Sequence, residues 1–245
     1  RKTSDLRWLK GLTIEFLYGD LFDHDALRDA ITGMDYVYHS AGITKAKKSE
    51  DYYRGNATGT KNLLDAVLKH NSTLQRFVHV SSQAAVGPSE SKAPITEEVL
   101  PHPITTYGRS KWQAEEECLK VADRIPITIV RPPVVFGPRD KDVFEFFNTM
   151  RKGLQPTVGF NEKLVSMIHV SDLVRGFVMA GESTKTIGQT YFISSKSVYG
   201  WKEIGQETQR ALGRRALRIR LPEWGVFVIA AFAELFALFS SRPAL

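Results

Sequence analysis

A tyrosine and a lysine four residues apart, Tyr107 and Lys111, lie in the stretch ITTYGRSKWQAEEE. Residues at positions i and i+4 of a helix share one face, so both side chains can reach the same cleft. A phenol has a pKa of ~10, and bringing it to ~7 needs about 4 kcal/mol of preference for the phenolate. A nearby cationic group can provide such a preference and make the tyrosine a general acid or base. Because ordinary amphipathic helices carry the same spacing by chance, the surrounding sequence must decide.

Serines and small residues follow two apolar runs that are expected to be strands. VHVSSQAAVGP places Ser81 and Ser82 at the end of one run, where a hydroxyl could hold a substrate oxygen. Ser81 is expected to be a hydrogen-bonded neighbour rather than a reacting group. YHSAG ends the other run with small residues that let a ligand approach the backbone. Both runs would end at the sheet edge where open α/β folds bind ligands.

Short apolar runs alternate with helical patterns along the first part of the chain. The runs are rich in β-branched residues and do not alternate with polar ones, as in parallel strands buried on both faces. We expect strands at 12–20, 34–42, 76–82 and 125–133, and helices at 23–31, 56–70 and 104–122. This order predicts an α/β protein with a Rossmann-type doubly wound parallel sheet.

The alternation becomes less regular after Gly137. We expect helices at 143–153, 171–182 and 200–214, the second capped by Ser171, and strands at 164–170 and 189–195. The sequence thus predicts a dinucleotide-binding core at 1–138. Residues 139–245 would form a smaller, mainly substrate-binding region, with some elements returning to the core.

The composition indicates which partners and which cellular compartment to expect. It has 245 residues and a net charge of +6 without a dense basic run, which argues against nucleic acid. A single cysteine, Cys118, excludes an internal disulfide and a cysteine-based zinc site and favours a reducing, cytoplasmic setting. No metal is assigned, because ligand spacing is absent around His24, His39, His70, His79 and His102.

An apolar segment at 225–239 follows LRIRLP near the end of the sequence. It is shorter than the ~20 residues that cross a bilayer and carries Glu234 in its middle. A buried or partner-covered helix is favoured, and an interfacial membrane helix is the alternative.

The motifs together resemble the extended short-chain dehydrogenases/reductases, often called NAD-dependent epimerases/dehydratases. The resemblance covers nearly the whole chain and is carried by YGDL, HSAG, NATGTKNLL, VHVSSQAAVG, YGRSK, RPPVVFGPRD and IHVSDL. It implies that Tyr107 is the general acid/base, that Lys111 lowers its pKa and binds the nicotinamide ribose, and that Ser82 orients the substrate oxygen. Asn56 matches the asparagine of a proton relay in the family but is also a good helix N-cap, and both roles stay open.

The same resemblance assigns the residues that would hold a dinucleotide. Asp20 and Leu21 would flank the adenine, and Pro133 would lie against the nicotinamide. The backbone of Ser40, Ala41 and Gly42 would line the cofactor. His169 and Asp172 match a family signature whose role is expected to be structural.

The sequence departs from the family where a glycine-rich turn should bind the pyrophosphate. We therefore expect a βαβ opening of roughly 30 residues or more to be missing before this sequence. The cofactor is expected to be NAD or NADP. Arg1 or Lys2, close to the end of the second strand of the family, would favour NADP by pairing with its 2′-phosphate.

Two valines bear on the substrate. Val134 and Val165 stand where nucleotide-sugar epimerases of this family carry an asparagine and an arginine that contact the diphosphate. A diphosphate buried there would keep an uncompensated charge, which favours bulky apolar substrates such as those of hydroxysteroid dehydrogenases and dihydroflavonol reductases. The expected activity is alcohol–ketone interconversion with NAD(P) in a homodimer. The alternatives are a nucleotide-sugar epimerase or dehydratase with bound NAD, and a non-catalytic cofactor-binding relative.

Overall fold

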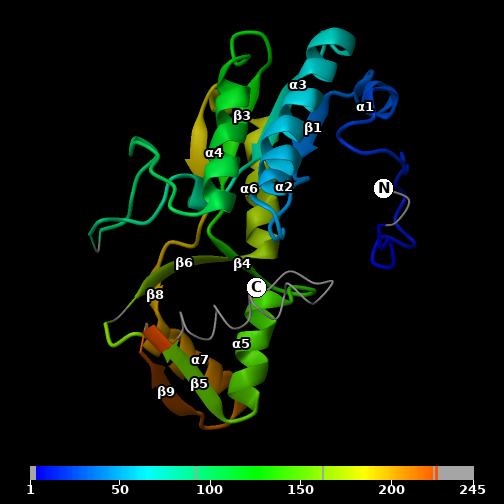
Figure 1. The fold of residues 1–245 in the computed structure, drawn as a ribbon. Helices are drawn as coiled ribbons and strands as arrows, with labels where there is room; N and C mark the ends of the chain where they lie inside the picture. Colours follow the sequence, from blue (N-terminus) through cyan, green and yellow to red (C-terminus); the bar gives the residue numbers. More distant parts are fainter. Residues whose placement is uncertain (1–3, 92, 162, 223, 226–245) are drawn as a thin grey trace.

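A computed structural model describes residues 4–91, 93–161, 163–222 and 224–225. Its upper half is built on one parallel sheet (Figure 1). The strand order is β1 (Tyr36–His39), β2 (Arg76–Val80), β3 (Ile127–Arg131) and β7 (Thr190–Phe192).

Helices cover both faces of this sheet. The helix α3 (Gly59–His70) packs between α1 (His24–Ile31) and α4 (Thr106–Leu119), and α6 (Val170–Glu182) contacts β1, β2 and β3. Within β2, Phe77 joins the core that includes residues of α1, α3 and α4, whereas the next residue, Val78, packs with Ala180 of α6. Both side chains are fully buried. The strands are therefore buried on both faces, and the predicted doubly wound sheet is confirmed.

The strand register brings three loops to one edge of the sheet. His39 lies opposite His79, and Val80 lies opposite Val130, so β1, β2 and β3 end almost level. Because the strands are parallel, the segments that follow them leave at the same edge. Residues 40–43, 81–85 and 132–134 are these segments, and they contain most of the predicted site.

The strand predicted at 12–20 is wrong. Residues 13–20 have no regular secondary structure, and Ile14, Leu17 and Tyr18 are exposed. A strand needs a neighbour for its backbone N–H and C=O groups. None of the described strands lies beside this segment, and β1 pairs with β2 alone.

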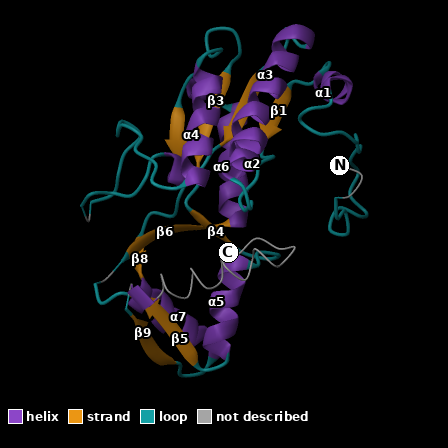
Figure 2. Cartoon of the chain, in the orientation of Figure 1, coloured by secondary structure: helices purple, strands orange, loops and turns teal. Residues whose placement is uncertain are grey.

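Small sheets and the helices α5 (Asp142–Arg151) and α7 (Trp201–Leu212) form the lower half of the molecule (Figure 2). One sheet joins β4 (Val134–Phe136), β6 (Leu164–His169) and β8 (Val198–Gly200). Another pairs β5 (Leu154–Val158) with β9 (Leu217–Leu221), next to α5 and α7. The division between residues 138 and 139 stays a prediction, since β4 precedes it and β7 returns to the large sheet.

Several short elements were not predicted, and one predicted cap is wrong. The strands β4, β5, β8 and β9 lack the long apolar runs of the large sheet. The additional helical segments are α2 (Ser49–Tyr53), a π-helical turn η1 (Arg54–Thr58), and 3₁₀ turns η2 (Gln83–Ala85) and η3 (Thr184–Thr186). The cap of α6 is His169, whose side chain accepts the Ser171 N–H, so Ser171 lies inside the helix.

Candidate active site

The helix α4 brings Tyr107 and Lys111 to the carboxyl end of β2. It begins directly after Thr105, whose Oγ1 accepts the Gly108 N–H at 2.9 Å, so Tyr107 falls in the first turn. Gly108 allows the helix to lie close to η2, because a Cβ at this position would collide with the Ala84 carbonyl oxygen. The cap and the glycine therefore fix where the phenol stands.

Ser82 lies beside that phenol. It begins η2 in an extended conformation, and its Oγ accepts the Ala84 N–H at 3.2 Å. Burial raises the pKa of the half-buried Tyr107 above its usual value, and a hydrogen bond from Ser82 opposes this rise. The phenol is consequently protonated at neutral pH. The expected lowering of the phenol pKa by Lys111 stays a prediction.

Lys111 is buried close to the same strand end. Its Nζ donates a hydrogen bond to the carbonyl of Val80, the last residue of β2, at 2.8 Å. Burial lowers its pKa to about 8, although the Glu115 carboxylate acts in the opposite direction. Because Val80 precedes Ser81 and Ser82 directly, the hydroxyl, the phenol and the ammonium group gather at one strand end.

A buried network behind these residues was not predicted. Glu115 is fully buried and accepts three hydrogen bonds from Arg131. Nε donates to Oε1 at 3.0 Å and to Oε2 at 3.2 Å, and Nη2 donates to Oε2 at 2.6 Å. The Ser81 hydroxyl also donates to Glu115, as expected for a hydrogen-bonded neighbour. The sequence held one signal, since Glu115 follows Lys111 by four residues and lies on the same helix face. The network joins α4 to β2 and β3.

Asn56 is buried inside the π-helical turn η1, so the helix N-cap interpretation is wrong. Its Oδ1 accepts the Ile43 N–H at 2.7 Å. Its Nδ2 donates to the Ile43 carbonyl at 3.0 Å and to Ser110 Oγ at 2.8 Å. These bonds fix the loop after β1 against α4 and occupy the side-chain amide. Its role in a proton relay stays a prediction.

Most of the other predicted site residues line one of two cavities. The first, about 560 Å³, is lined by Asp20, Leu21, Ala41 and Gly42 together with Gly19 and Gly55. Its small residues leave room for a flat ring against the backbone, which fits the adenine end of a dinucleotide. Ser40 is exposed but does not line it.

The second cavity, hereafter the Ser82 cavity, has a volume of about 790 Å³. Its lining includes the predicted residues Ser82, Pro133, Val134 and Val165, and also Arg131 and Phe192. Tyr107 and Lys111 line neither of these two cavities; Tyr107 packs edge-on against Tyr52, with ring centroids 6.4 Å apart. The predicted catalytic and cofactor residues therefore share a sheet edge without lining one common cavity.

The IHVSDL motif makes contacts within and beside α6. His169 Nδ1 lies 2.7 Å from Ser171 Oγ, and its ring packs edge-on against Phe136 at 5.4 Å. Asp172 is exposed and pairs with Arg175 at 3.8 Å. The structural role expected for both residues stays a prediction.

The sheet and the residues at its edge define a Rossmann-type α/β protein with a serine, a tyrosine and a lysine at one strand end. A sequence profile described as the NAD dependent epimerase/dehydratase family matches residues 1–193, and the chain belongs to this family of extended short-chain dehydrogenases/reductases.

Curated relatives of this chain include enzymes with different names. Ceramide reductase of Caulobacter vibrioides is 28% identical over 96% of this chain and 68% of its own length. An N-acetyl-alpha-D-glucosaminyl-diphospho-ditrans,octacis-undecaprenol 4-epimerase of Escherichia coli O157:H7 is 28% identical over 83% of this chain and 62% of its own. A protein of Sinorhizobium fredii is 32% identical, and the match spans 47% of its length. The chain thus spans about half to two thirds of these relatives.

Solved structures support the fold and bear on the cofactor. UDP-glucuronic acid 4-epimerase from Bacillus cereus in complex with NAD gives a TM-score of 0.80 at 26% identity, covering 89% of this chain and 72% of that one. The protein gox2253 gives 0.81 at 26% identity, covering 99% and 75%. The preference for NADP finds no support, since the first neighbour holds NAD and Arg1 and Lys2 lie outside the described residues.

Three further expectations concern the setting of the protein. Within the described residues, no helix is long and apolar enough to span a bilayer. Residues 226–239 of the predicted apolar helix lie outside the described part of the chain. The homodimer and the cytoplasmic setting stay predictions.

Proposed function

We propose that this protein is an NAD(P)-dependent oxidoreductase that interconverts an alcohol and a ketone on a bulky, mostly apolar small molecule. The observation that carries the proposal is the position of the buried Lys111, whose Nζ donates to the Val80 carbonyl directly before Ser81 and Ser82, one helical turn from Tyr107 on the same helix. A site without catalytic use has no physical need for this arrangement, since burying a lysine costs stability.

The cofactor would supply the hydride chemistry, and the chain supplies groups to bind it. Asp20, Leu21, Ala41 and Gly42 would hold its adenine half, and Pro133 would lie against its nicotinamide, as the family resemblance implies. Ser40 would contribute through its backbone.

The protein side chains handle the proton at the substrate oxygen. In ketone reduction, the protonated Tyr107 donates its proton to the oxygen while Ser82 orients that oxygen by a hydrogen bond. In alcohol oxidation, the phenolate takes the proton, and the Lys111 charge favours the phenolate. Asn56 would support both directions by holding the loop after β1.

The Ser82 cavity favours an apolar substrate. Ile104, Leu164 and Val198 line it besides Val134 and Val165, and its volume of about 790 Å³ suits a bulky molecule. Two of the relatives are named for such compounds, the ceramide reductase and a 3 beta-hydroxysteroid dehydrogenase/Delta 5-->4-isomerase of Mycobacterium tuberculosis.

A nucleotide-sugar epimerase is the second candidate. Lys196 is exposed and lines the Ser82 cavity, where it could meet a phosphate. The neighbour from Bacillus cereus is also a UDP-sugar 4-epimerase. An epimerase would bind NAD tightly and show no net change in nicotinamide absorbance, whereas the proposed oxidoreductase converts NAD(P) stoichiometrically with substrate.

The test is a screen of apolar alcohols and ketones with NAD and NADP, followed by nicotinamide absorbance. Tyr107→Phe should abolish most turnover. Tyr36→Phe is the matched control, since Tyr36 begins β1, at the opposite edge of the sheet, and is exposed. Cofactor conversion that survives in Tyr107→Phe would exclude the mechanism.

A further inference from the structure

The two-stranded sheet β5–β9 exposes apolar side chains and buries polar ones. In β5, Gln155 and Thr157 are 3% and 6% exposed, and Gln155 Nε2 donates to the Trp201 carbonyl of α7 at 3.1 Å. Successive side chains of a strand point to opposite faces. Leu154, Pro156 and Val158 therefore point away from the helices, and all three are exposed.

The register extends this apolar surface onto β9. Leu154 lies opposite Leu217, Pro156 opposite Ile219 and Val158 opposite Leu221. Paired residues of parallel strands share a face, so the sheet has a continuous β5–β9 apolar face. The face consists of Leu154, Pro156, Val158, Leu217, Ile219 and Leu221. Leu217, at one end of this face, is 69% exposed, and contiguous exposed apolar residues are typical of interaction surfaces.

Arginines are concentrated on β9 and in the residues just before it. Residues 208–222 contain five arginines and no aspartate or glutamate. Within the described part of the chain, no ion pair involves Arg215, Arg218 or Arg220. Arg218 and Arg220 lie opposite Gln155 and Thr157, so they leave β9 on the face opposite the apolar one. Among the described strands β9 has β5 as its neighbour, and the long arginine side chains can bend around its outer edge so that their charges lie beside the apolar face.

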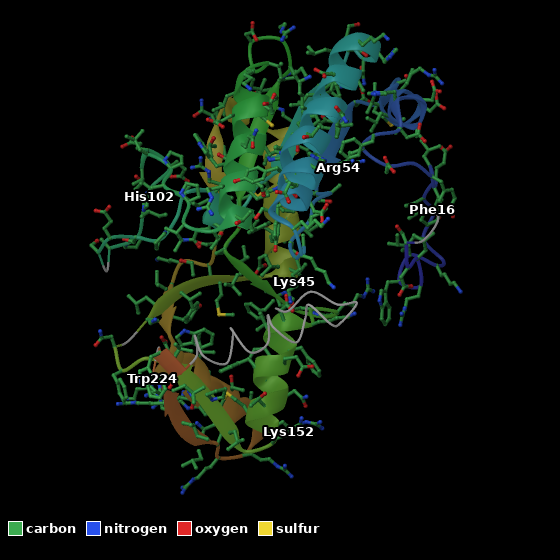
Figure 3. The ribbon with its side chains drawn as sticks, in the orientation of Figure 1. Phe16, Lys45, Arg54, His102, Lys152 and Trp224 are labelled. Atoms are coloured by element: carbon green, nitrogen blue, oxygen red, sulfur yellow. The ribbon has the colours of Figure 1, made fainter. Side chains whose placement is uncertain are left out.

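Other exposed groups lie near the ends of this sheet. Lys152 lies between α5 and β5 at the foot of the molecule, and Trp224 lies beyond the end of β9 (Figure 3). Trp224 is 72% exposed and Phe160, just after β5, is 70% exposed. Aromatic rings of this kind are favourable at the boundary between water and lipid, where one side is apolar and the other wet.

We propose that the β5–β9 apolar face docks on an anionic lipid bilayer, with its arginines against the headgroups. A bilayer surface offers apolar depth and negative charge together, which is the combination this face presents. Nucleic acid would satisfy the arginines but leave the apolar centre without a partner. A symmetric contact between two copies would bring the two arginine rows together and repel.

The proposal concerns binding and is independent of the proposed reaction. It also differs from a membrane-spanning helix, because the docking surface is a sheet face made of described residues. In the sequence, β9 is followed by the apolar segment at 225–239.

The first test is sedimentation of the full chain with vesicles. Phosphatidylcholine vesicles containing phosphatidylglycerol should bind the protein, and vesicles of phosphatidylcholine alone should bind it weakly. The double variant Arg218→Glu/Arg220→Glu should bind the anionic vesicles about tenfold or more weakly. The matched control Lys69→Glu/Lys185→Glu, with the same charge change at exposed positions of the upper half, should bind as the wild type does. Equal binding by the two double variants would overturn the proposal.

The second test reports where the lipid lies. Cys118 is buried, so a cysteine introduced as Leu217→Cys can be labelled selectively with a polarity-sensitive fluorophore. Its emission should shift to the blue with anionic vesicles, and the same label in Lys69→Cys should not shift. A label at Leu217→Cys already shifted in the lipid-free monomer would mean that the chain itself covers the face. A shift accompanied by dimers on size exclusion would mean a second copy, and either result would overturn the proposal.

Discussion

Arg131 of β3 and Glu115 of α4 form an ion pair that is almost completely removed from solvent, with Nη2 and Oε2 at 2.6 Å. The Ser81 hydroxyl completes the pair, and Ser82 follows in sequence. The helix that carries Tyr107 is thereby fixed to the strand that carries Ser82. Removing one partner of such a pair leaves a buried charge, which is more costly than losing an exposed pair.

Glu115→Gln should therefore destabilise the protein by about 3–5 kcal/mol, because the Arg131 charge stays buried without compensation. The double variant Glu115→Leu/Arg131→Met should recover most of that loss, since neither charge remains. Urea denaturation measures both. Asp65→Asn, which breaks the exposed pair with Lys61, is the control and should change stability by less than about 1 kcal/mol. A Glu115→Gln effect no larger than that of the control would contradict the account.

Lys111→Met should stabilise the fold while abolishing activity. Burial lowers the pKa of Lys111 from 10.5 to about 8. Because the folded-state pKa is below the unfolded one, the unfolded chain binds the proton of Lys111 more tightly. The lysine therefore costs no stability above pH 10.5, and the cost grows until it is complete as the pH falls through 8. At pH 7 the buried charge of Lys111 destabilises the folded protein by about 3 kcal/mol. Its replacement removes this cost but also removes the hydrogen bond to Val80, which stabilises by about 1 kcal/mol, so the variant should be more stable by about 2 kcal/mol. Denaturation at pH 7 should show it, and a destabilised variant would refute this reading.

Acid should unfold the protein through two buried histidines. Burial, aided by the Lys111 charge, lowers the pKa of His39 from 6.5 to about 3 and that of the fully buried His79 well below 6.5. The unfolded chain binds these protons first, so stability is full above pH 6.5 and declines as the pH falls toward the folded pKa values. Each histidine should contribute about 1.4 kcal/mol of loss per pH unit.

The histidine variants separate the two contributions. His39→Gln can keep a bond to Thr60, whose Oγ1 lies 2.9 Å from His39 Nε2, and should remove about half of the pH slope. Denaturant titrations between pH 7 and pH 5 measure that slope. A slope identical to that of the wild type would show that His39 is not a buried neutral group.

Gly108→Ala should strongly reduce the rate of turnover. The added methyl group would meet the Ala84 carbonyl oxygen and push α4 away from η2, which separates Tyr107 from Ser82. Misplacing a reacting group by about 1 Å can cost about a hundredfold in rate. Steady-state kinetics should show this loss, and Gln113→Ala on the exposed part of α4 should leave the rate unchanged. An unaltered rate in Gly108→Ala would show that the close contact does not position the phenol.

The sequence predicted the elements whose signals are local. The strands at Phe77 and Ile129 are apolar without alternation, so their places could be predicted directly. The Tyr107 helix was predicted at 104–122, but its cap, Thr105, was not. The partner of Glu115 could not be predicted, because Arg131 is 16 residues away on another element and the contact depends on the tertiary fold.

The wrong predictions have the same origin in long-range structure. Residues 12–20 have the pattern of a strand, but a strand also needs a neighbour, which the described residues do not provide. Asn56 has the residue type of a cap, yet the helix starts before it, and its amide instead holds Ile43 and Ser110. The short strand β5 contains a proline and exposes its apolar residues, so its sequence pattern does not predict a strand.

The most direct test of the central claim is the rate of NAD(P) conversion by Tyr107→Phe, measured with the best substrate from the screen. Proton transfer by a positioned side chain contributes about 10²–10⁴-fold, so the rate should fall by that factor while the urea midpoint stays within the range of Tyr36→Phe. A Tyr107→Phe protein that turns over within about twofold of the wild-type rate would contradict the assignment of the phenol as the proton-transfer group.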